Sequence, residues 1–258
     1  MSFQGKAAII TGGANGIGRC IAECFLDKGA FVAVIDTDAA RGAQMEEKYG
    51  EKFLFFSGDI VEEKTLDSFI KAVLSRFSKI HYLINNAMRS KGGILSGCDY
   101  RDFEYTLRVG VTAPYYLTMK LKDNFAPDAA IVNISSSRSG QSQPDTESYT
   151  AAKGGIAALT HALSVSLAGV ARVNAIAPGW IDTSQWHEGC PAPQHSAPDR
   201  FQHPVRRLGR AEDIAKLALF LCGEDAGFIT GQEIFADGGM SKLMIYHSDC
   251  GWSYQPGS

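Results

Sequence analysis

Short apolar runs alternate along the chain with longer segments in which apolar residues recur every three or four positions. The short runs consist mostly of Ile, Val, Leu, Phe and Ala, a pattern typical of strands that are buried on both faces of a parallel sheet. The longer segments have the period of helices that cover such a sheet. The predicted strands are 6–11, 30–36, 53–57, 80–85, 129–135, 171–177 and 233–236. The predicted helices are 16–28, 39–49, 62–77, 100–124, 148–168 and 211–222.

This alternation predicts an α/β fold, a doubly wound parallel sheet of about seven strands with helices on both faces. No linker or internal repeat divides the chain, so we expect a single domain over residues 1–258. The segment from 184 to about 208 breaks the pattern, and its first 21 residues, 184–204, hold four of the nine prolines. We expect a substrate lid there, with an inert insertion as the alternative. The tail, 241–258, is rich in apolar residues and is expected to pack on its own subunit or on a neighbour.

Composition excludes several classes of protein. A chain with 45% hydrophobic and 10% aromatic residues is not disordered, and a net charge of −3 gives no field for nucleic acid or anionic lipid. The short cluster Arg206, Arg207 and Arg210 is typical of a solvated face. No apolar run approaches about 18 residues and no secretory signal is evident, so we expect a cytoplasmic protein without a membrane partner. Neither the six cysteines nor the six histidines have metal-ligand spacing, and we expect no metal.

The first predicted strand leads directly into the sequence TGGANGIG at 11–18 and then into a helix. Glycines at 12, 16 and 18 suit a tight turn and a close approach of the backbone to a pyrophosphate, which the helix N-terminus would face. An ordinary left-handed turn is the alternative. The position of the motif, between the first strand and the first helix, favours a dinucleotide site.

Asp36 ends the second predicted strand, at a distance that suits a hydrogen bond to an adenosine ribose. Its carboxylate would repel a 2′-phosphate, and Thr37 adds no positive charge. The sequence therefore favours NAD(H) over NADP(H). Arg19 and Arg41 are the two cations that could reverse this preference.

Tyr149 and Lys153 are four positions apart on a predicted helix and therefore share one face. An ammonium there favours the phenolate and makes the tyrosine a usable general acid/base. The motif YxxxK is common by chance, so a surface pair on a helix is the alternative. Three hydroxyls, Ser135, Ser136 and Ser137, follow the fifth strand as candidates to assist the tyrosine.

Taken in order, these motifs resemble the short-chain dehydrogenase/reductase family, and the resemblance covers about residues 5–240. It rests on TGGANGIG, Asp59, Asn85-Asn86-Ala87, Ser136 thirteen positions before Tyr149, YTAAK at 149–153, PGWIDT at 178–183 and the stretch 208–239. The resemblance implies a single-domain Rossmann-type fold and the nicotinamide-dependent interconversion of an alcohol and a carbonyl compound. It also implies a homotetramer or homodimer built through the helices 100–124 and 148–168.

The resemblance further implies roles for individual residues. Tyr149 would exchange a proton with the substrate, Lys153 would hold the nicotinamide ribose and lower the pKa of the tyrosine, and Ser136 would polarise the carbonyl. Asp59 and Ile60 would meet the adenine. The implied cofactor-binding residues are Gly12, Asn15, Gly16, Ile17, Gly18, Asp36, Asp59, Ile60, Asn86, Ala87, Tyr149, Lys153, Pro178, Gly179, Ile181 and Thr183.

Two residues depart from the family pattern. Met88 stands where the family has a glycine, and Gly110 stands where it usually has an asparagine that kinks a helix and anchors a proton-relay water. A glycine permits the kink but lacks the side-chain carbonyl. An active NAD(H)-dependent oxidoreductase is expected, and the alternative is an NAD(H)-binding sensor or assembly subunit with impaired catalysis. Gln141, Gln143, Glu147, Trp186 and His187 suggest a mixed polar and aromatic substrate pocket.

Overall fold

Seven parallel strands form one sheet in the order β3-β2-β1-β4-β5-β6-β9. The computed structural model describes residues 3–187, 189–191, 193–246, 248–249 and 253. The strands are β1 Ala7–Thr11, β2 Phe31–Asp36, β3 Phe53–Ser57, β4 Ile80–Asn85, β5 Phe125–Ile134, β6 Ala171–Pro178 and β9 Glu233–Ala236. The order reverses between β1 and β4, which confirms the predicted doubly wound, Rossmann-type α/β fold.

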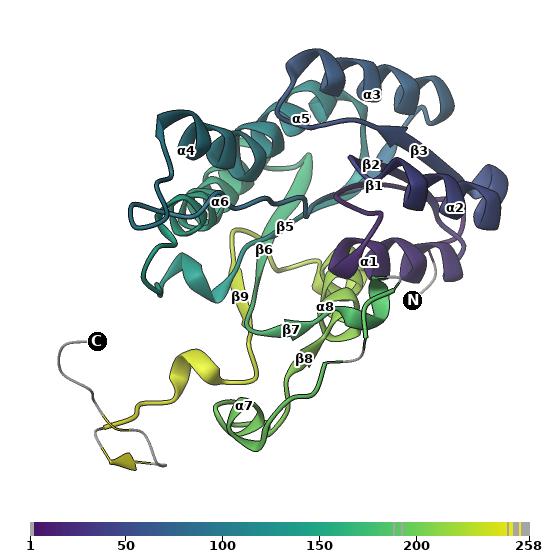
Figure 1. The fold of residues 1–258 in the computed structure, drawn as a ribbon. Helices are drawn as coiled ribbons and strands as arrows, with labels where there is room; N and C mark the ends of the chain where they lie inside the picture. The colour runs from purple at the N-terminus through teal and green to yellow at the C-terminus, as the bar shows by residue number, and fades with distance from the viewer. Residues whose placement is uncertain (1–2, 188, 192, 247, 250–252, 254–258) are drawn as a thin grey trace.

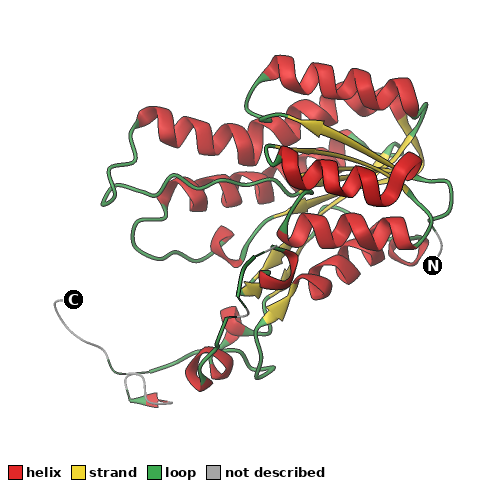
Figure 2. Ribbon diagram, turned by 45° about the vertical axis from the view of Figure 1, so that its right-hand side comes forward, coloured by secondary structure: helices red, strands yellow, loops and turns green. Residues whose placement is uncertain are grey.

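Helices cover both faces of this sheet (Figures 1 and 2). Ile10 of β1 packs in one apolar cluster with Phe25 of α1 and Leu219 of α8, while its neighbour Ile9 packs in a second cluster with Phe69 of α3. Because successive residues of a strand point to opposite faces, both must be apolar here, which explains the uninterrupted apolar runs. The helices are α1 Gly16–Asp27, α2 Ala39–Tyr49, α3 Glu63–Arg76, α4 Tyr100–Leu107, α5 Ala113–Leu121, α6 Glu147–Ser166, α7 Ala197–Phe201 and α8 Ala211–Cys222.

The predicted helix 100–124 is not one regular helix. A π-helical turn over 108–112 separates α4 from α5, and β5 begins at 125, four residues earlier than predicted. Pro114 lies in the first turn of α5 and has no N–H to donate to the carbonyl of Gly110, four residues before it. The N–H of Ala113 bonds instead to the carbonyl of Arg108, five residues back, which is the bond of a π turn.

The segment 184–208 is more ordered than its prolines suggest. It begins in a 3₁₀ turn, Ser184–Trp186, and contains α7, whose N-terminus is capped by Ser196 and Asp199. A two-stranded ribbon that the sequence did not predict, β7 (Ile181–Asp182) with β8 (Gly209–Arg210), closes the segment at its two ends. The ribbon fixes both ends beside the sheet and leaves α7 at the outside of the fold (Figure 1).

Residues 243–246 of the C-terminal tail leave the body of the fold after a 3₁₀ turn at Met240–Lys242 (Figures 1 and 2). The side chain of Met244 is 73% exposed and Tyr246 is exposed as well. The expectation that the tail packs on its own subunit is therefore wrong for these residues, and packing on a neighbouring subunit stays a prediction. Trp252 and Tyr254 lie outside the described residues. Among the helices of the described part, none is long and apolar enough to cross a membrane.

Candidate active site

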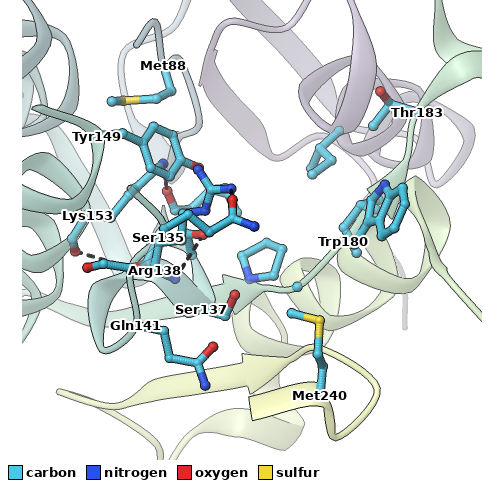
Figure 3. A pocket seen from close by; sticks show the side chains of 18 of the residues that line it. Met88, Ser135, Ser137, Arg138, Gln141, Tyr149, Lys153, Trp180, Thr183 and Met240 are labelled. Atoms are coloured by element: carbon cyan, nitrogen blue, oxygen red, sulfur yellow. Dashed lines mark hydrogen bonds between the residues drawn. The ribbon is translucent and has the colours of Figure 1, made fainter. Parts of the chain in front are cut away.

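Two adjoining cavities lie where β1 to β6 end at their carboxyl edges, and Asn86 and Met88 line both. The larger has a volume of about 710 Å³ (Figure 3) and the smaller of about 320 Å³. Of the residues predicted from the sequence, the larger is lined by Ile17, Asn86, Ser136, Tyr149, Lys153, Pro178, Gly179, Ile181 and Thr183. The smaller is lined by Gly12, Asn15, Asp36, Asp59, Ile60, Asn86 and Ala87. Together the cavities form one groove across the point where the strand order reverses, the usual ligand position in such sheets.

The glycine turn forms the floor of this groove. Gly12 has a φ of +66° and Gly16 of +57°, in the left-handed region that favours glycine. A Cβ on Gly12 would lie 2.7 Å from the Cα of Ala87, and one on Gly18 would collide with the carbonyl of Gly12. The side chain of Asn15 does not cap α1, so the first N–H groups of this helix have no partner within it. The turn therefore leaves room and free donors for an anionic ligand.

Asn86 fixes the shape of the turn. Its Nδ2 donates to the carbonyl oxygens of Gly12 at 2.8 Å and Thr11 at 3.1 Å. The hydroxyl oxygen of Thr11 in return accepts the N–H groups of Asn86 at 3.0 Å and Ala87 at 3.1 Å. The end of β4 is thus tied to the end of β1.

Asp36 and Asp59 lie along the smaller cavity. The carboxylate of Asp36 accepts the N–H groups of Ala14 at 2.9 Å and Asp38 at 3.0 Å, which holds it beside the glycine turn. Asp59 accepts the hydroxyl of Tyr105 at 2.8 Å. Burial, with this bond to Asp59, raises the pKa of Tyr105 to about 12, so its hydroxyl stays protonated as the donor. The sequence analysis did not identify Tyr105 as a site residue, because a single aromatic residue in a predicted helix does not by itself indicate a site.

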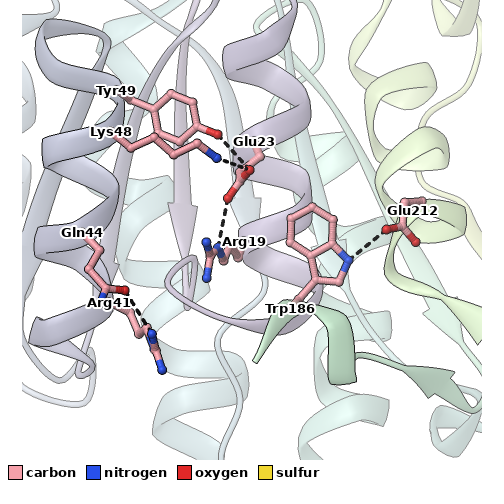
Figure 4. Close-up of polar contacts among 8 residues, drawn as sticks. All are labelled: Arg19, Glu23, Arg41, Gln44, Lys48, Tyr49, Trp186 and Glu212. Carbon is pink, nitrogen blue, oxygen red and sulfur yellow. Dashed lines mark hydrogen bonds and ion pairs between the residues drawn. The ribbon is translucent and has the colours of Figure 1, made fainter. Parts of the chain in front are cut away.

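Neither Arg19 nor Arg41 is among the residues that line the two cavities. Figure 4 shows the polar contacts of both. The Nε of Arg19 lies 3.0 Å from the carboxylate of Glu23, and Arg41 donates to the side-chain oxygen of Gln44 at 3.0 Å. Glu23 also accepts the hydroxyl of Tyr49 at 2.8 Å, so it is held in place from two helices. These contacts fix both arginines on the surfaces of α1 and α2.

Tyr149 and Lys153 are not a surface pair. Lys153 is 4% exposed, its Nζ donates to the carbonyl of Ile134 at 2.7 Å, and it lies 5.5 Å from the centroid of the Tyr149 ring. Burial lowers the pKa of Lys153 to about 8. The ammonium is thus held at the end of β5, next to the phenol ring and inside the larger cavity.

The three serines differ in what their hydroxyls contact. Ser135 donates to the carboxylate of Glu233 at 2.7 Å and is therefore engaged in bonding to β9. The Oγ of Ser136 accepts the N–H of Arg138 at 3.2 Å, which leaves the hydroxyl proton free to point elsewhere. Ser137 also lines the larger cavity. The proton of Ser135 is thus engaged by Glu233, whereas Ser136 and Ser137 both line the cavity without such a contact.

The two departures from the family pattern occupy one space. A Cβ on Gly110 would lie 2.8 Å from the Cβ of Ala152 and 3.2 Å from the sulfur of Met88. Gly110 is buried in the π-helical turn, so a longer side chain there would have nowhere else to go. Met88 therefore takes the place of a side chain at position 110, a relationship that no spacing in the sequence could reveal.

The structure places some of the predicted pocket residues in the cavities and others outside them. Gln141 and Gln143 line the larger cavity, and His187 lines the smaller one beside Gly16. Trp186 lines neither cavity: its indole packs on the apolar core, and its Nε1 donates to Glu212 at 2.9 Å (Figure 4). Glu147 also points away and accepts the N–H of Ile94 at 3.2 Å. The expected roles of Trp186 and Glu147 in the pocket are thus wrong.

Sequence reasoning missed six residues that line the larger cavity: Ile134, Arg138, Ser142, Trp180, Gln202 and Met240. Arg138, Trp180 and Met240 are labelled in Figure 3. Arg138 follows the serines, and Trp180 lies in the stretch PGWIDT, so both stood beside recognised motifs. Only the fold shows that they face the cavity. Among the described residues, no group of three or more His, Cys, Asp or Glu side chains could hold a metal ion.

Comparison with known proteins agrees with this geometry. A family model described as enoyl-(acyl carrier protein) reductase matches residues 12–241. The chain is similar to an oxidoreductase of Thermotoga maritima, with 37% identity over 95% of this chain and 99% of the relative.

Two solved structures are also similar to this chain. The apo SCOR enzyme of Clostridium thermocellum has a TM-score of 0.89 and 42% identity, covering 97% of this chain and 98% of the other. The 3-ketoacyl-(acyl-carrier-protein) reductase of Brucella melitensis, solved with NADH, has a TM-score of 0.82 and 31% identity, covering 93% and 100%. The chain therefore belongs to the short-chain dehydrogenase/reductase family of nicotinamide-dependent oxidoreductases.

Proposed function

We propose that the protein interconverts a secondary alcohol and a ketone with NAD(H), using Tyr149 as the general acid/base. The observation that carries this proposal is the buried Lys153 beside Tyr149, with the free hydroxyl proton of Ser136 in the same cavity. These groups can bind a carbonyl oxygen, supply its proton and hold a positive charge nearby.

The groove fits a dinucleotide. The glycine turn offers uncapped N–H groups where a pyrophosphate would lie, and the two cavities on either side of it have room for the two halves of the molecule. A bound nicotinamide supplies or accepts the hydride, which is chemistry that no side chain of the cavity can perform. In this assignment Gly12, Asn15 and Asp36 belong to the adenosine half, and Ile181 and Thr183 to the nicotinamide half.

The protein residues would then handle the proton. Ser136 donates its hydroxyl proton to the substrate oxygen, because its own oxygen already accepts the N–H of Arg138. Tyr149 gives a proton to that oxygen in the reduction and takes it back in the oxidation. Lys153 stabilises the negative charge that the tyrosine bears after giving up its proton. It also donates to the nicotinamide ribose.

The preference for NAD(H) is supported by the position of Asp36 and by the contacts of the two nearby arginines. Asp36 faces the smaller cavity, where its charge disfavours a 2′-phosphate. Arg19 and Arg41 contact Glu23 and Gln44 and do not line this cavity. Arg89 does line it, and is the cation whose charge competes with that of Asp36. Kinetic constants measured with NADH and NADPH under the same conditions test this preference.

The direct test of the proposed reaction is NADH oxidation with a panel of ketones, in the wild type and in Tyr149→Phe. We expect turnover in the wild type and its loss in the variant, with the Kd for NADH changed by no more than a few-fold. A variant that keeps near wild-type rates would place the proton donor elsewhere.

A second candidate is an NAD(H)-binding sensor or assembly subunit with impaired catalysis. It is favoured by Gly110 at the family's relay position and by Met88 in place of the family's glycine. Against it, Ser136, Tyr149 and Lys153 are all present in the larger cavity, and Pro114 has no N–H to donate to the carbonyl of Gly110. Tight NADH binding without turnover of any ketone in the panel would favour the sensor.

Assembly into a homodimer or homotetramer through α4, α5 and α6 is part of the proposal. Apolar side chains on these helices face outward: Tyr115 and Met119 on α5, and Val165, 77% exposed, on α6. Light scattering after size-exclusion chromatography tests the oligomeric state, and a monomer at working concentrations would contradict it.

A further inference from the structure

Charge is distributed unevenly in the larger cavity. Two of its lining residues are basic, Arg138 and Lys153, and none of the described residues that line it is an aspartate or glutamate. Lys153 lies at the back of the site, bonded to the carbonyl of Ile134. Arg138 is thus a second cation in the cavity, and the reaction described above makes no use of its side chain.

The side chain of Arg138 reaches toward the reacting end of the cavity (Figure 3). Its Cζ lies 5.7 Å from the centroid of the Tyr149 ring. One of its nitrogens donates to the side-chain oxygen of Gln143, which holds the guanidinium in this position. Among the described residues no carboxylate oxygen lies within 4.0 Å of it, whereas Arg19, Arg108 and Arg207 each have one.

We propose that Arg138 binds a carboxylate of the substrate, so that the protein acts on hydroxy acids and oxo acids. This inference rests on the proposed function and names its substrate class. A guanidinium has five N–H donors, and a planar carboxylate can accept two of them at once. The remaining polar side chains on this side of the cavity, Gln141 and Ser142, are neutral and do not compensate the charge.

The distance from Arg138 to Tyr149 limits the length of the substrate. The guanidinium lies over the phenol ring, 5.7 Å from its centroid. A carboxylate bound by Arg138 would therefore be only a few bonds from a carbon that reacts at the hydroxyl of Tyr149. In the reduction the carbonyl carbon gains the hydride, its oxygen gains the proton of Tyr149, and the carboxylate is unchanged. A 2-, 3- or 4-oxo acid meets this geometry.

The test compares pyruvate, acetoacetate and levulinate with their methyl esters, which differ from the acids in charge and hardly in shape. In the wild type we expect kcat/KM for at least one acid to exceed that of its ester by tenfold or more. In Arg138→Gln this ratio should fall at least tenfold, while the backbone N–H that Ser136 accepts is retained. Arg101→Gln removes an equal charge from an exposed position of α4 and should leave the ratio unchanged.

Binding gives a second, independent readout. Acetoacetate and methyl acetoacetate are titrated calorimetrically into the NAD⁺-saturated wild type and Arg138→Gln, in which the ketones cannot be reduced, and we expect tighter binding of the acid in the wild type alone. Should neither acids nor esters be reduced, the ketone panel decides separately whether the proposed function holds, and this titration still decides the role of Arg138. Equal affinity for acid and ester, or an unchanged ratio in Arg138→Gln, overturns the inference. Stronger inhibition of ketone reduction by inorganic phosphate than by acetate would also overturn the inference. Arg138 would then bind a phosphate group of the substrate instead of a carboxylate.

Discussion

The sulfur of Met88 lies 3.2 Å from the place that a Cβ of residue 110 would take, so Met88 and Gly110 share one space in the wall of the site. Met88 lines both cavities, and Gly110 belongs to the π-helical turn between α4 and α5. A change at either position therefore acts on the other.

Gly110→Asn should destabilise the protein, because the new side chain collides with Met88 and Ala152. Overpacking of this kind costs about 1–3 kcal/mol of the free energy of unfolding. The double variant Met88→Gly with Gly110→Asn should recover part of that loss, as it removes one of the two obstacles. Denaturant unfolding of the wild type, both single variants and the double variant measures the coupling. Strictly additive effects would show that the two residues do not share this space.

Ser136→Ala should lower kcat by about 10²-fold, the scale observed when one donor to a developing oxyanion is removed. Ser135→Ala is the matched control, because its hydroxyl bonds to Glu233 and not to the substrate. We expect Ser135→Ala to reduce stability and to affect kcat much less. Steady-state kinetics together with thermal unfolding separates the two effects, and a larger kcat loss in Ser135→Ala would reverse the assignment of the serines.

Asp36→Ala should relax the preference for NADH over NADPH. The carboxylate is held beside the glycine turn by the N–H groups of Ala14 and Asp38, so its removal takes away both a ribose acceptor and a repulsive charge. The ratio of kcat/KM for the two cofactors is the measurement, and we expect it to shift toward NADPH by about tenfold, the effect of about 1.4 kcal/mol. An unchanged ratio would count against the role of Asp36.

Lys153 should make the stability of the cofactor-free protein depend on alkaline pH. Its pKa is about 8 in the fold and 10.5 ordinarily, so between these values the unfolded chain binds the proton and the fold does not. The free energy of unfolding therefore rises with pH between pH 8 and 10.5, by up to about 3 kcal/mol. Below pH 8 the lysine is charged in the fold, and the full cost of burying that charge lowers the stability.

Lys153→Met removes the titrating group and is the reference for this effect. The free energy of unfolding of the wild type relative to the variant should rise from pH 8 toward 10 and stay flat between pH 6 and 7.5. Urea unfolding at a series of pH values measures it. A constant difference across the whole range would show that the lysine titrates normally in the fold.

Local sequence patterns determined much of this protein. The apolar runs identify the seven strands because strands buried on both faces need apolar residues at consecutive positions, as Ile9 and Ile10 illustrate. The turn at Gly12 and Gly16 requires a left-handed backbone, which glycine adopts at little cost. The pairing of Tyr149 with Lys153 follows from the helical repeat alone. Each of these features depends on neighbours in the chain.

Tertiary structure decided what depends on residues far apart in the sequence. The choice among the serines required Glu233, which reaches Ser135 from β9, and the position of Trp186 required Glu212 on α8. The shared space of Met88 and Gly110 exists only because the segment after β4 meets the π-helical turn between α4 and α5 there. In the sequence, nothing distinguishes Arg138 from the other charged residues. It becomes a candidate anion-binding group because no carboxylate of the described residues lies within 4.0 Å of it, which is a property of the folded cavity that no local pattern records.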